Sequence, residues 1–339
     1  MFLRCLIVSA LAVLMVACRQ SSPSTEPNHP TIETPSTPQL NTQSETNGPP
    51  NSGEFQDVLN EFMGLNERLE RIAARIMIAN ADLCDTVEND IGLSTHTLND
   101  YPADLKTAAA HYLKVGQGLS VRTVRPQSPA HKAGMRTGDR IVKINETSLI
   151  DSPLFTDNDL AGPIAKAAFH SALDKLHSKE SAVIDYQRGD NTRRAELVVT
   201  PKCKLPVTLF FSEDVNGHLI DDEIWITSGL LRTIRDDVRV AYIMGHEMAH
   251  ALRGHVDTHT PDIELEADRL GLILLARAGY DPETLSTFWT EQIDLFDGGD
   301  TTSDSHPDLI SRKDNFTSTL AQIKAANHDD DTLKSLFFR

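Results

Sequence analysis

The spacing of apolar residues changes along the chain, and each change marks a different kind of structure. Between Phe55 and about Glu88 apolar residues recur three or four positions apart, with Gly64 as the only Gly or Pro break, so one long or two short helices are expected. Between Gly116 and Pro201 short apolar runs alternate with Gly and Pro, which predicts a compact β-rich module. From Val238 to Leu252 the chain is apolar on nearly every side, which is typical of a buried helix.

The polar residues of that buried helix are concentrated at His246, Glu247 and His250. The two histidines are one turn apart, so both imidazoles project from the same face with the glutamate beside them. Burying these groups is costly unless something compensates them, and a divalent metal does so. His-Glu-x-x-His is the zinc metalloprotease arrangement, in which the histidines bind the metal and the glutamate is the general base.

A catalytic zinc needs a third protein ligand and an open position for water. The candidates downstream are His255, His259, Glu264, Glu266 and Asp268. Both His255 and His259 fall where the first helix should end, and we interpret them as solvated loop residues. The ligand is therefore expected among the three carboxylates.

A second helix is expected from Asp262 through Ala278, with Gly279 as its C-terminal stop. On this helix Glu264 and Asp268 share a face, whereas Glu266 points away. This geometry favours Glu264 as the third ligand and places Asp268 to accept a hydrogen bond from a ligand histidine. We interpret Glu266 as an ordinary exposed carboxylate.

Four segments in this part of the chain resemble the HtpX-type zinc metallopeptidases, the group that includes the CAAX prenyl proteases. They are Thr227–Leu231, His246–His250, Glu264–Asp268, and His306-Pro307 followed by Arg312. The resemblance covers about Leu205 to Leu320 and implies a mainly helical metallopeptidase domain with a small edge sheet and one Zn²⁺ per chain. The helices before Gly116 are expected to complete the same fold, which makes the β-rich module an insertion.

The resemblance also suggests further catalytic residues. His306 is expected to approach the metal or the substrate oxyanion, and Arg312 to bind substrate or an acidic residue; structural hydrogen bonding is the alternative for both. Glu223–Thr227 reads as a strand, and in related enzymes an edge strand near the active helix pairs with extended substrate, although core packing is equally open. The short stretch between His250 and Glu264 departs from many relatives and leaves the shape of the cleft open.

The β-rich module resembles a bacterial PDZ domain. The matching segments are Gly118–Val121, Ser128–Ala130, Ala133–Met135 and Gly138–Asn145. The resemblance implies that a peptide adds as a strand beside the one that starts near Leu119, with Gly118, Leu119 and Ser120 forming the peptide-binding loop. A helix from Asp159 to Leu176 is expected beside the groove. Use of the module only as a spacer or a lid is the alternative.

The N-terminal segment predicts export. Arg4 precedes an apolar stretch from Cys5 to Ala17 that is too short to cross a bilayer and suits a secretory signal peptide. Its end resembles the bacterial lipobox, which implies that Cys18 becomes the lipid-modified first residue, with a plain signal peptide as the alternative. From Gln20 to about Ser52 the chain is polar and Pro-rich, and we interpret it as a flexible tether.

Composition and cysteine usage agree with this location. The 339 residues are 40% apolar, enough for two ordinary domains, and a net charge of −17 argues against nucleic acid or an anionic lipid surface as the main partner. Cys84 and Cys203 remain after processing and can form one disulfide in an oxidising periplasm, or stay as separate buried thiols. Residue 19, which follows the predicted lipidated Cys18, is Arg and not the Asp that commonly retains lipoproteins at the inner membrane, and this favours the outer membrane.

These observations predict an α+β protein with five segments. They are a signal peptide (1–17), a tether (18–53), N-terminal helices on the catalytic domain (54–115), a PDZ domain (116–203) and a zinc metallopeptidase domain (204–339). The expected function is zinc-dependent endoproteolysis of unfolded or misassembled cell-envelope proteins in the periplasm by a lipid-anchored enzyme. A PDZ lipoprotein adaptor or chaperone with a latent peptidase domain is the main alternative, and a zinc hydrolase acting on a non-peptide bond is another. The natural substrate and the oligomeric state stay open.

Overall fold

The computed structural model describes residues 52–116, 118–150, 160–255, 260–288, 307–327 and 329–338. The predicted signal peptide, Cys18, nearly all of the tether, His259 and His306 lie outside these residues. Within the described residues helices occur together with strands that pair mostly antiparallel, so the predicted α+β class is confirmed. No helix in the described part is both long and apolar enough to cross a bilayer.

The first described element is one long helix, α1 (Ser52–Ala79). Its apolar positions recur at helical spacing, and Leu69, Ile72 and Ile76 are buried in the main core. Gly64 lies inside the helix with open space around it and does not break it. A single turn, η1 (Ala81–Leu83), follows and leads to Cys84.

The chain enters and leaves the β-rich module through adjacent strands. Strand β1 (Val87–Asp90) pairs antiparallel with β8 (Thr200–Cys203), and Val87 lies opposite Cys203. A disulfide joins Cys84 to Cys203, with a Cα–Cα distance of 5.6 Å. The disulfide and the strand pair therefore bracket the whole module between residues 85 and 202.

Six strands form the sheet of this module. They are β2 (Leu93–His96), β3 (Ser120–Val124), β4 (Arg140–Ile144), β5 (Thr147–Ser148), β6 (Ser181–Arg188) and β7 (Asn191–Val198). Their order is β2-β3-β4-β6-β7 with β5 beside β4, and every pair is antiparallel. Because β2 precedes residue 116, the sheet begins earlier in the chain than the expected domain boundary.

The helices of the module are α2 (Lys106–Tyr112), α3 (Pro129–Lys132) and α4 (Ala161–Asp174), and a turn, η2 (Leu98–Asp100), follows β2. Helix α4 lies within the predicted helix of residues 159–176. Its Phe169 is fully buried with Leu119, Ile141 and Ile184 of the sheet. The sheet and α4 therefore share one core, separate from that of the C-terminal part.

The C-terminal part begins with a three-stranded sheet of β9 (Val207–Phe210), β10 (Gly217–Ile220) and β11 (Glu223–Thr227). The order is β10-β11-β9, with β11 antiparallel to β10 and parallel to β9. The predicted strand at residues 223–227 is therefore present, but it is the central strand. Its backbone is paired on both sides and has no edge for a substrate.

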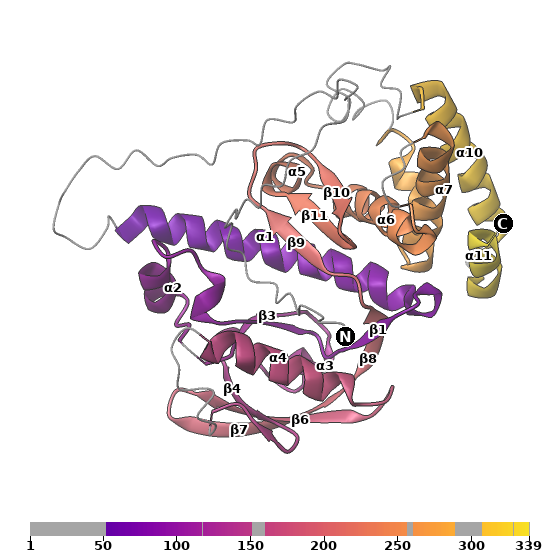
Figure 1. The fold of residues 1–339 in the computed structure, drawn as a ribbon. Helices are drawn as coiled ribbons and strands as arrows, with labels where there is room; N and C mark the ends of the chain where they lie inside the picture. Colours follow the sequence, from indigo (N-terminus) through magenta and orange to yellow (C-terminus); the bar gives the residue numbers. More distant parts are fainter. Residues whose placement is uncertain are drawn as a thin grey trace, which may run out of the picture. The chain divides into compact units, whose positions relative to one another are not determined.

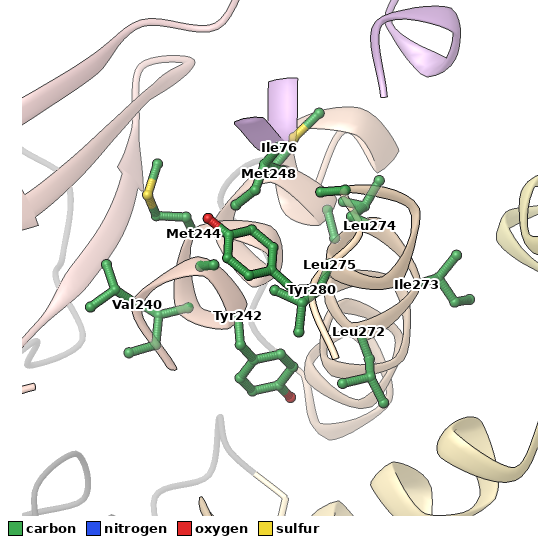
Figure 2. Close-up of a cluster of buried hydrophobic side chains, with 14 of the residues drawn as sticks. Ile76, Val240, Tyr242, Met244, Met248, Leu272, Ile273, Leu274, Leu275 and Tyr280 are labelled. Atoms are coloured by element: carbon green, nitrogen blue, oxygen red, sulfur yellow. The ribbon is translucent and has the colours of Figure 1, made fainter. Parts of the chain in front are cut away.

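Helices build the rest of this part. They are α5 (Ser228–Thr233), α6 (Asp237–Arg253), α7 (Pro261–Arg277), η4 (Pro282–Leu285), α10 (Leu309–Ala325) and α11 (Asp330–Phe337) (Figure 1). Figure 2 shows their core, in which Met244 and Met248 of α6 lie near Leu274 and Leu275 of α7 and Ile76 of α1. Helix α1 thus packs in the same core as the two helices that carry the predicted metal ligands.

Candidate metal centre

Helix α6 presents the first two predicted ligands. The Asp236 side chain caps its N-terminus, and Gly254 ends it in the left-handed conformation with φ of 65°. His246, Glu247 and His250 lie in its second half, where the helix is buried. The position of α6 in the fold therefore places His246, Glu247 and His250 in the interior of the protein even without a bound metal.

Helix α7 brings the third predicted ligand. The Thr260 side chain accepts a hydrogen bond at its N-terminus and Pro261 occupies its first turn, so the helix starts at the predicted place. Glu264 is in the first turn, only 2% exposed, and Asp268 is buried one turn later. The two carboxylates share a face, as their spacing predicts.

Two glycines allow α6 and α7 to approach closely. A Cβ atom added at Gly245 would lie 2.9 Å from the backbone oxygen of Gly271, and one added at Gly271 would lie 2.8 Å from the backbone nitrogen of His246. The helices therefore meet backbone to backbone at this crossing. This contact is next to His246 and helps to hold the first turn of α7 within reach of both histidines.

The three predicted ligands converge. The Nε2 atoms of His246 and His250 are 3.0 Å apart. Oxygens of Glu264 lie 3.4 Å from Nε2 of His246 and 3.7 Å from Nε2 of His250. A tetrahedral zinc with bonds of about 2.0–2.2 Å holds its ligand atoms roughly 3.3–3.5 Å apart. The donor set and its spacing therefore fit zinc, and three protein ligands leave a fourth position open.

Asp268 holds the first histidine. Its Oδ1 accepts from Nδ1 of His246 at 3.1 Å and from the hydroxyl of Tyr242 at 3.1 Å. Arg312 of α10 donates to both carboxylate oxygens, each at 2.8 Å. Because Nδ1 of His246 donates to Asp268, its Nε2 is left with a lone pair for a metal.

The electrostatics of this group favour positive charge at the ligand position. Burial would raise the pKa of Asp268, but the Arg312 guanidinium and His246 hold it well below its usual range. Burial would likewise lower the pKa of His246, but its hydrogen bonds to Asp268 and Glu264 raise it to about 10. The same two carboxylates that stabilise an imidazolium would stabilise a bound cation.

Glu247 follows His246 on α6 and is not part of the candidate ligand group. It is 9% exposed, and burial raises its pKa to about 7. The backbone N–H of Leu219 on β10 donates to its carboxylate. A carboxylate with a pKa near neutrality can both accept and return a proton.

The structure overturns the interpretation of His255 as a solvated loop residue. His255 is only 11% exposed, and its Nδ1 lies 3.2 Å from Nδ1 of His250. Its Nε2 lies 3.4 Å from Glu266, whose carboxylate also accepts from Arg253 at 2.9 Å. The left-handed turn at Gly254 directs the chain back, and the backbone N–H of His255 donates to the carbonyl of His250. Gly254 is the sequence signal from which this reversal of chain direction could have been predicted.

The other two predicted catalytic residues differ in status. Arg312 is in the first turn of α10 and donates two hydrogen bonds to Asp268, so it is linked to the ligand His246 through that carboxylate. A role for Arg312 at the substrate stays a prediction. His306 lies outside the described residues.

The predicted peptide-binding loop at Gly118, Leu119 and Ser120 is corrected by the sheet order. These residues lead into β3, which has β2 on one side and β4 on the other. Leu119 is fully buried, and its carbonyl accepts from Ile141. A peptide has no room to add as a strand here.

Strands β2 and β7 are at the two edges of this sheet within the described residues, and β2 directly follows Ile91 and Gly92. Gly92 has φ of +83°, and a Cβ atom there would lie 2.0 Å from Cβ of Ser128, so only glycine fits. A cavity of about 460 Å³ is lined by β2 and by Phe169 and Leu173 of α4. The apolar-Gly-apolar pattern Ile91-Gly92-Leu93 is visible in the sequence, but it lies before residue 116, the expected start of the module.

Comparisons with known proteins give two matches within the chain. Residues 214–262 match the model of Peptidase family M48, and residues 120–154 match that of the PDZ domain. Mitochondrial metalloendopeptidase OMA1 of Arabidopsis thaliana is 31% identical over 189 residues, 42% of this chain and 39% of that protein. Serine protease HTRA3 of Rattus norvegicus is 38% identical over 63 residues, 18% of this chain and 14% of that protein.

Among solved structures, the HtrA3 PDZ domain bound to a phage-derived ligand is 21% identical, with a TM-score of 0.24, and the match covers 34% of this chain and 89% of that one. The chain spans less than half the length of the curated relatives it matches. The family match contains His246, Glu247 and His250. The chain is therefore similar to Peptidase family M48 over residues 214–262 and to the PDZ domain over residues 120–154.

Proposed function

We propose that this protein is a zinc-dependent metalloendopeptidase that cleaves peptide bonds in unfolded polypeptides. The observation that carries the proposal is the convergence of His246, His250 and Glu264 beside a buried Glu247. Two imidazoles and one carboxylate are the ligand set of a class of catalytic zinc sites. The likeness to a metalloendopeptidase over 189 residues supports the same activity.

Different residues of the chain have different roles in the proposed hydrolysis. Zinc, when bound, supplies a water of lowered pKa and polarises the substrate carbonyl. Glu247 accepts the proton of the attacking water and then delivers it to the leaving amine. Asp268 and Arg312 keep His246 in the tautomer that presents Nε2, and His255 does the same for His250.

We assign the substrate backbone to the edge of β10. This strand ends the three-stranded sheet, and Leu219 within it already donates its N–H to Glu247. An extended segment added to this edge would pass directly beside the general base. This assignment replaces the earlier one to the central strand β11. It predicts a preference for unfolded chains, since a folded protein has few free extended segments.

The PDZ domain is proposed to recruit substrate or to regulate cleavage. The proposed location is the periplasmic side of the outer membrane, with a lipid anchor at Cys18 and with misassembled cell-envelope proteins as substrates. Support for this location comes from the sequence that ends at Cys18 and from Arg19 after it.

Metal content and casein cleavage test the proposal, with the wild-type protein beside Glu247→Gln. We expect one zinc per chain in both and a loss of cleavage of about 10²- to 10⁴-fold in the variant, because only the proton transfer is removed. Zinc in both without cleavage by either would favour a latent or adaptor role. Absence of zinc from both would refute the ligand assignment.

A further inference from the structure

The three-stranded sheet of β9, β10 and β11 has two different faces. Ile224 and Ile226 of β11 are fully buried in the core that also contains α6. Because side chains alternate along a strand, Trp225 between them points to the other side of the sheet. The register places Phe210 of β9 and Ile220 of β10 on that same side. We call this side, with Phe210, Ile220 and Trp225, the outer face.

The outer face carries apolar side chains that the fold leaves open. Phe210 is 43% exposed and Ile220 is 46% exposed. The rings of Phe210 and Trp225 have their centroids 5.4 Å apart, and Ile220 is a diagonal neighbour of Trp225 across the β10–β11 pair. The three side chains therefore form a strip across the sheet from β9 to β10. Exposed apolar residues that are contiguous, and not scattered singly, indicate an interaction site.

One end of this strip is at the strand that contacts the general base. Strand β10 is an edge strand among the described residues and lies beside α6 (Figure 1). Leu219, whose N–H donates to Glu247, directly precedes Ile220. A segment paired along β10 alternates its side chains between the two sides of the sheet. Its side chains on the outer side would lie against Ile220, with Trp225 and Phe210 beyond.

The turn at the end of β10 adds negative charge to this surface. Asp221 and Asp222 are both exposed and form the two-residue connection to β11, with φ of 49° and 60°. Their carboxylates are therefore held at the β10 end of the strip. Negative charge attracts Lys and Arg and repels an anionic bilayer, so we assign the outer face to a polypeptide and not to a lipid surface.

We propose that the outer face binds substrate segments that carry large apolar side chains at alternate positions next to a Lys or Arg. This inference rests on the proposed function for the assignment of the substrate backbone to β10. Burial of the apolar side chains against Phe210, Ile220 and Trp225 supplies free energy of binding, and the Asp221-Asp222 turn attracts the cation. Folded proteins bury most such apolar stretches, so the surface distinguishes unfolded chains from folded ones.

Fluorescence anisotropy tests the proposed surface directly. The probe is a fluorescein-labelled twelve-residue peptide amide with phenylalanine at alternate positions and two lysines after them. The protein is the full chain carrying Glu247→Gln, so binding is measured without cleavage. Adding Phe210→Ser and Ile220→Ser to this parent should weaken probe binding about tenfold, because the apolar strip is interrupted at two places. Both side chains are partly exposed, so the fold should be kept.

Val198→Ser is the matched control, since Val198 is 49% exposed and lies on β7 of the other sheet. It should leave probe affinity within about twofold. Equal binding by the Phe210→Ser/Ile220→Ser protein and its parent would overturn the role of the outer face. Absence of probe binding to the parent would overturn the site altogether.

The charge preference has its own comparison. A second probe with glutamate in place of both lysines should bind the parent about tenfold more weakly. Asp221→Asn/Asp222→Asn keeps the shape of the turn, because asparagine tolerates positive φ, and should remove most of this difference. Equal affinity of the parent for the two probes would refute the preference for a basic residue.

Photo-crosslinking locates the bound segment. The first probe, with a benzoylphenylalanine in place of one phenylalanine, is irradiated with the Glu247→Gln protein, and the modified fragments are mapped by mass spectrometry. Crosslinks are expected between residues 207 and 227, and crosslinks confined to other parts of the chain would contradict the proposal. Absence of casein cleavage by the wild type would refute the proposed function and would leave the binding and crosslinking results unchanged.

Discussion

The tautomer of each ligand histidine is set by a residue outside the ligand set. If His250 binds metal through Nε2, its proton is on Nδ1 and is donated to Nδ1 of His255, 3.2 Å away. His255 must then carry its own proton on Nε2, which faces Glu266. Arg253 holds that carboxylate in turn, so a chain of three side chains fixes one ring.

His255→Phe tests this chain of contacts. The ring size is kept but the acceptor is lost, so zinc affinity, measured by competition with a chelator, should fall about 10- to 100-fold. His131→Phe removes an exposed histidine elsewhere and should leave affinity unchanged. Unchanged zinc affinity in His255→Phe would show that His255 does not orient the ligand.

The buried pair of Asp268 and Arg312 predicts how stability depends on pH. The pKa of Asp268 is lowered in the folded state, so its ionised form contributes stability above its unfolded pKa of about 3.9, and this is lost as pH falls below that value. Asp268→Asn should lower the free energy of unfolding at pH 7 by roughly 3 kcal/mol, because Arg312 is left buried without a carboxylate. The decrease in the free energy of unfolding between about pH 5 and pH 2 should also be smaller in Asp268→Asn than in the wild type.

Urea denaturation at a series of pH values, with excess chelator in every sample, measures this effect without a contribution from metal. Asp262→Asn is the control, because Asp262 is exposed on the same helix. Parallel pH profiles for Asp268→Asn and the wild type would refute the assignment of the lowered pKa.

The side chains that the structure brings together as the sequence predicts are those whose relation along the chain is local. His246, Glu247 and His250 lie within one turn of helix, and Glu264 and Asp268 within one turn of the next, so helical spacing alone places each group. His255 depends on a change of chain direction at Gly254, which periodicity does not register. Its interpretation as a solvated loop residue was wrong for that reason.

At the scale of elements, the metal centre depends on how closely α6 and α7 cross. Gly271→Ala would place a Cβ atom 2.8 Å from the backbone nitrogen of His246, so the helices must separate. We expect a loss of about 1–3 kcal/mol in stability, measured by urea denaturation, together with weaker zinc binding. Zinc binding should weaken because separation of the two helices changes the position of His246 relative to Glu264.

Gly64→Ala is the matched control within a helix. Nothing lies within 4 Å of a Cβ atom at Gly64, so alanine should stabilise the protein by about 0.5–1 kcal/mol through helix propensity. If Gly271→Ala were stabilised and kept the zinc affinity of the wild type, the crossing of α6 and α7 would have space for a Cβ atom at this position.

Strands are predicted from sequence more easily than their order. The runs that form β3, β4, β6 and β11 are each visible as alternating or apolar stretches, and all are present. Which of them has a free edge depends on pairings between distant residues, such as Leu93 with Val124. The predicted groove and the predicted substrate strand were both misplaced because β3 and β11 turned out to have neighbours on both sides.

At the scale of the whole molecule, the Cys84–Cys203 disulfide closes a segment of 119 residues that includes the entire PDZ sheet. In the unfolded chain such a bond removes much of the freedom of that segment, which corresponds to about 2–4 kcal/mol of stability. Reduction of the wild-type protein should therefore lower its free energy of unfolding by this amount. The double variant Cys84→Ala/Cys203→Ala should not respond to the reductant, and an equal response in both proteins would refute the bond's contribution.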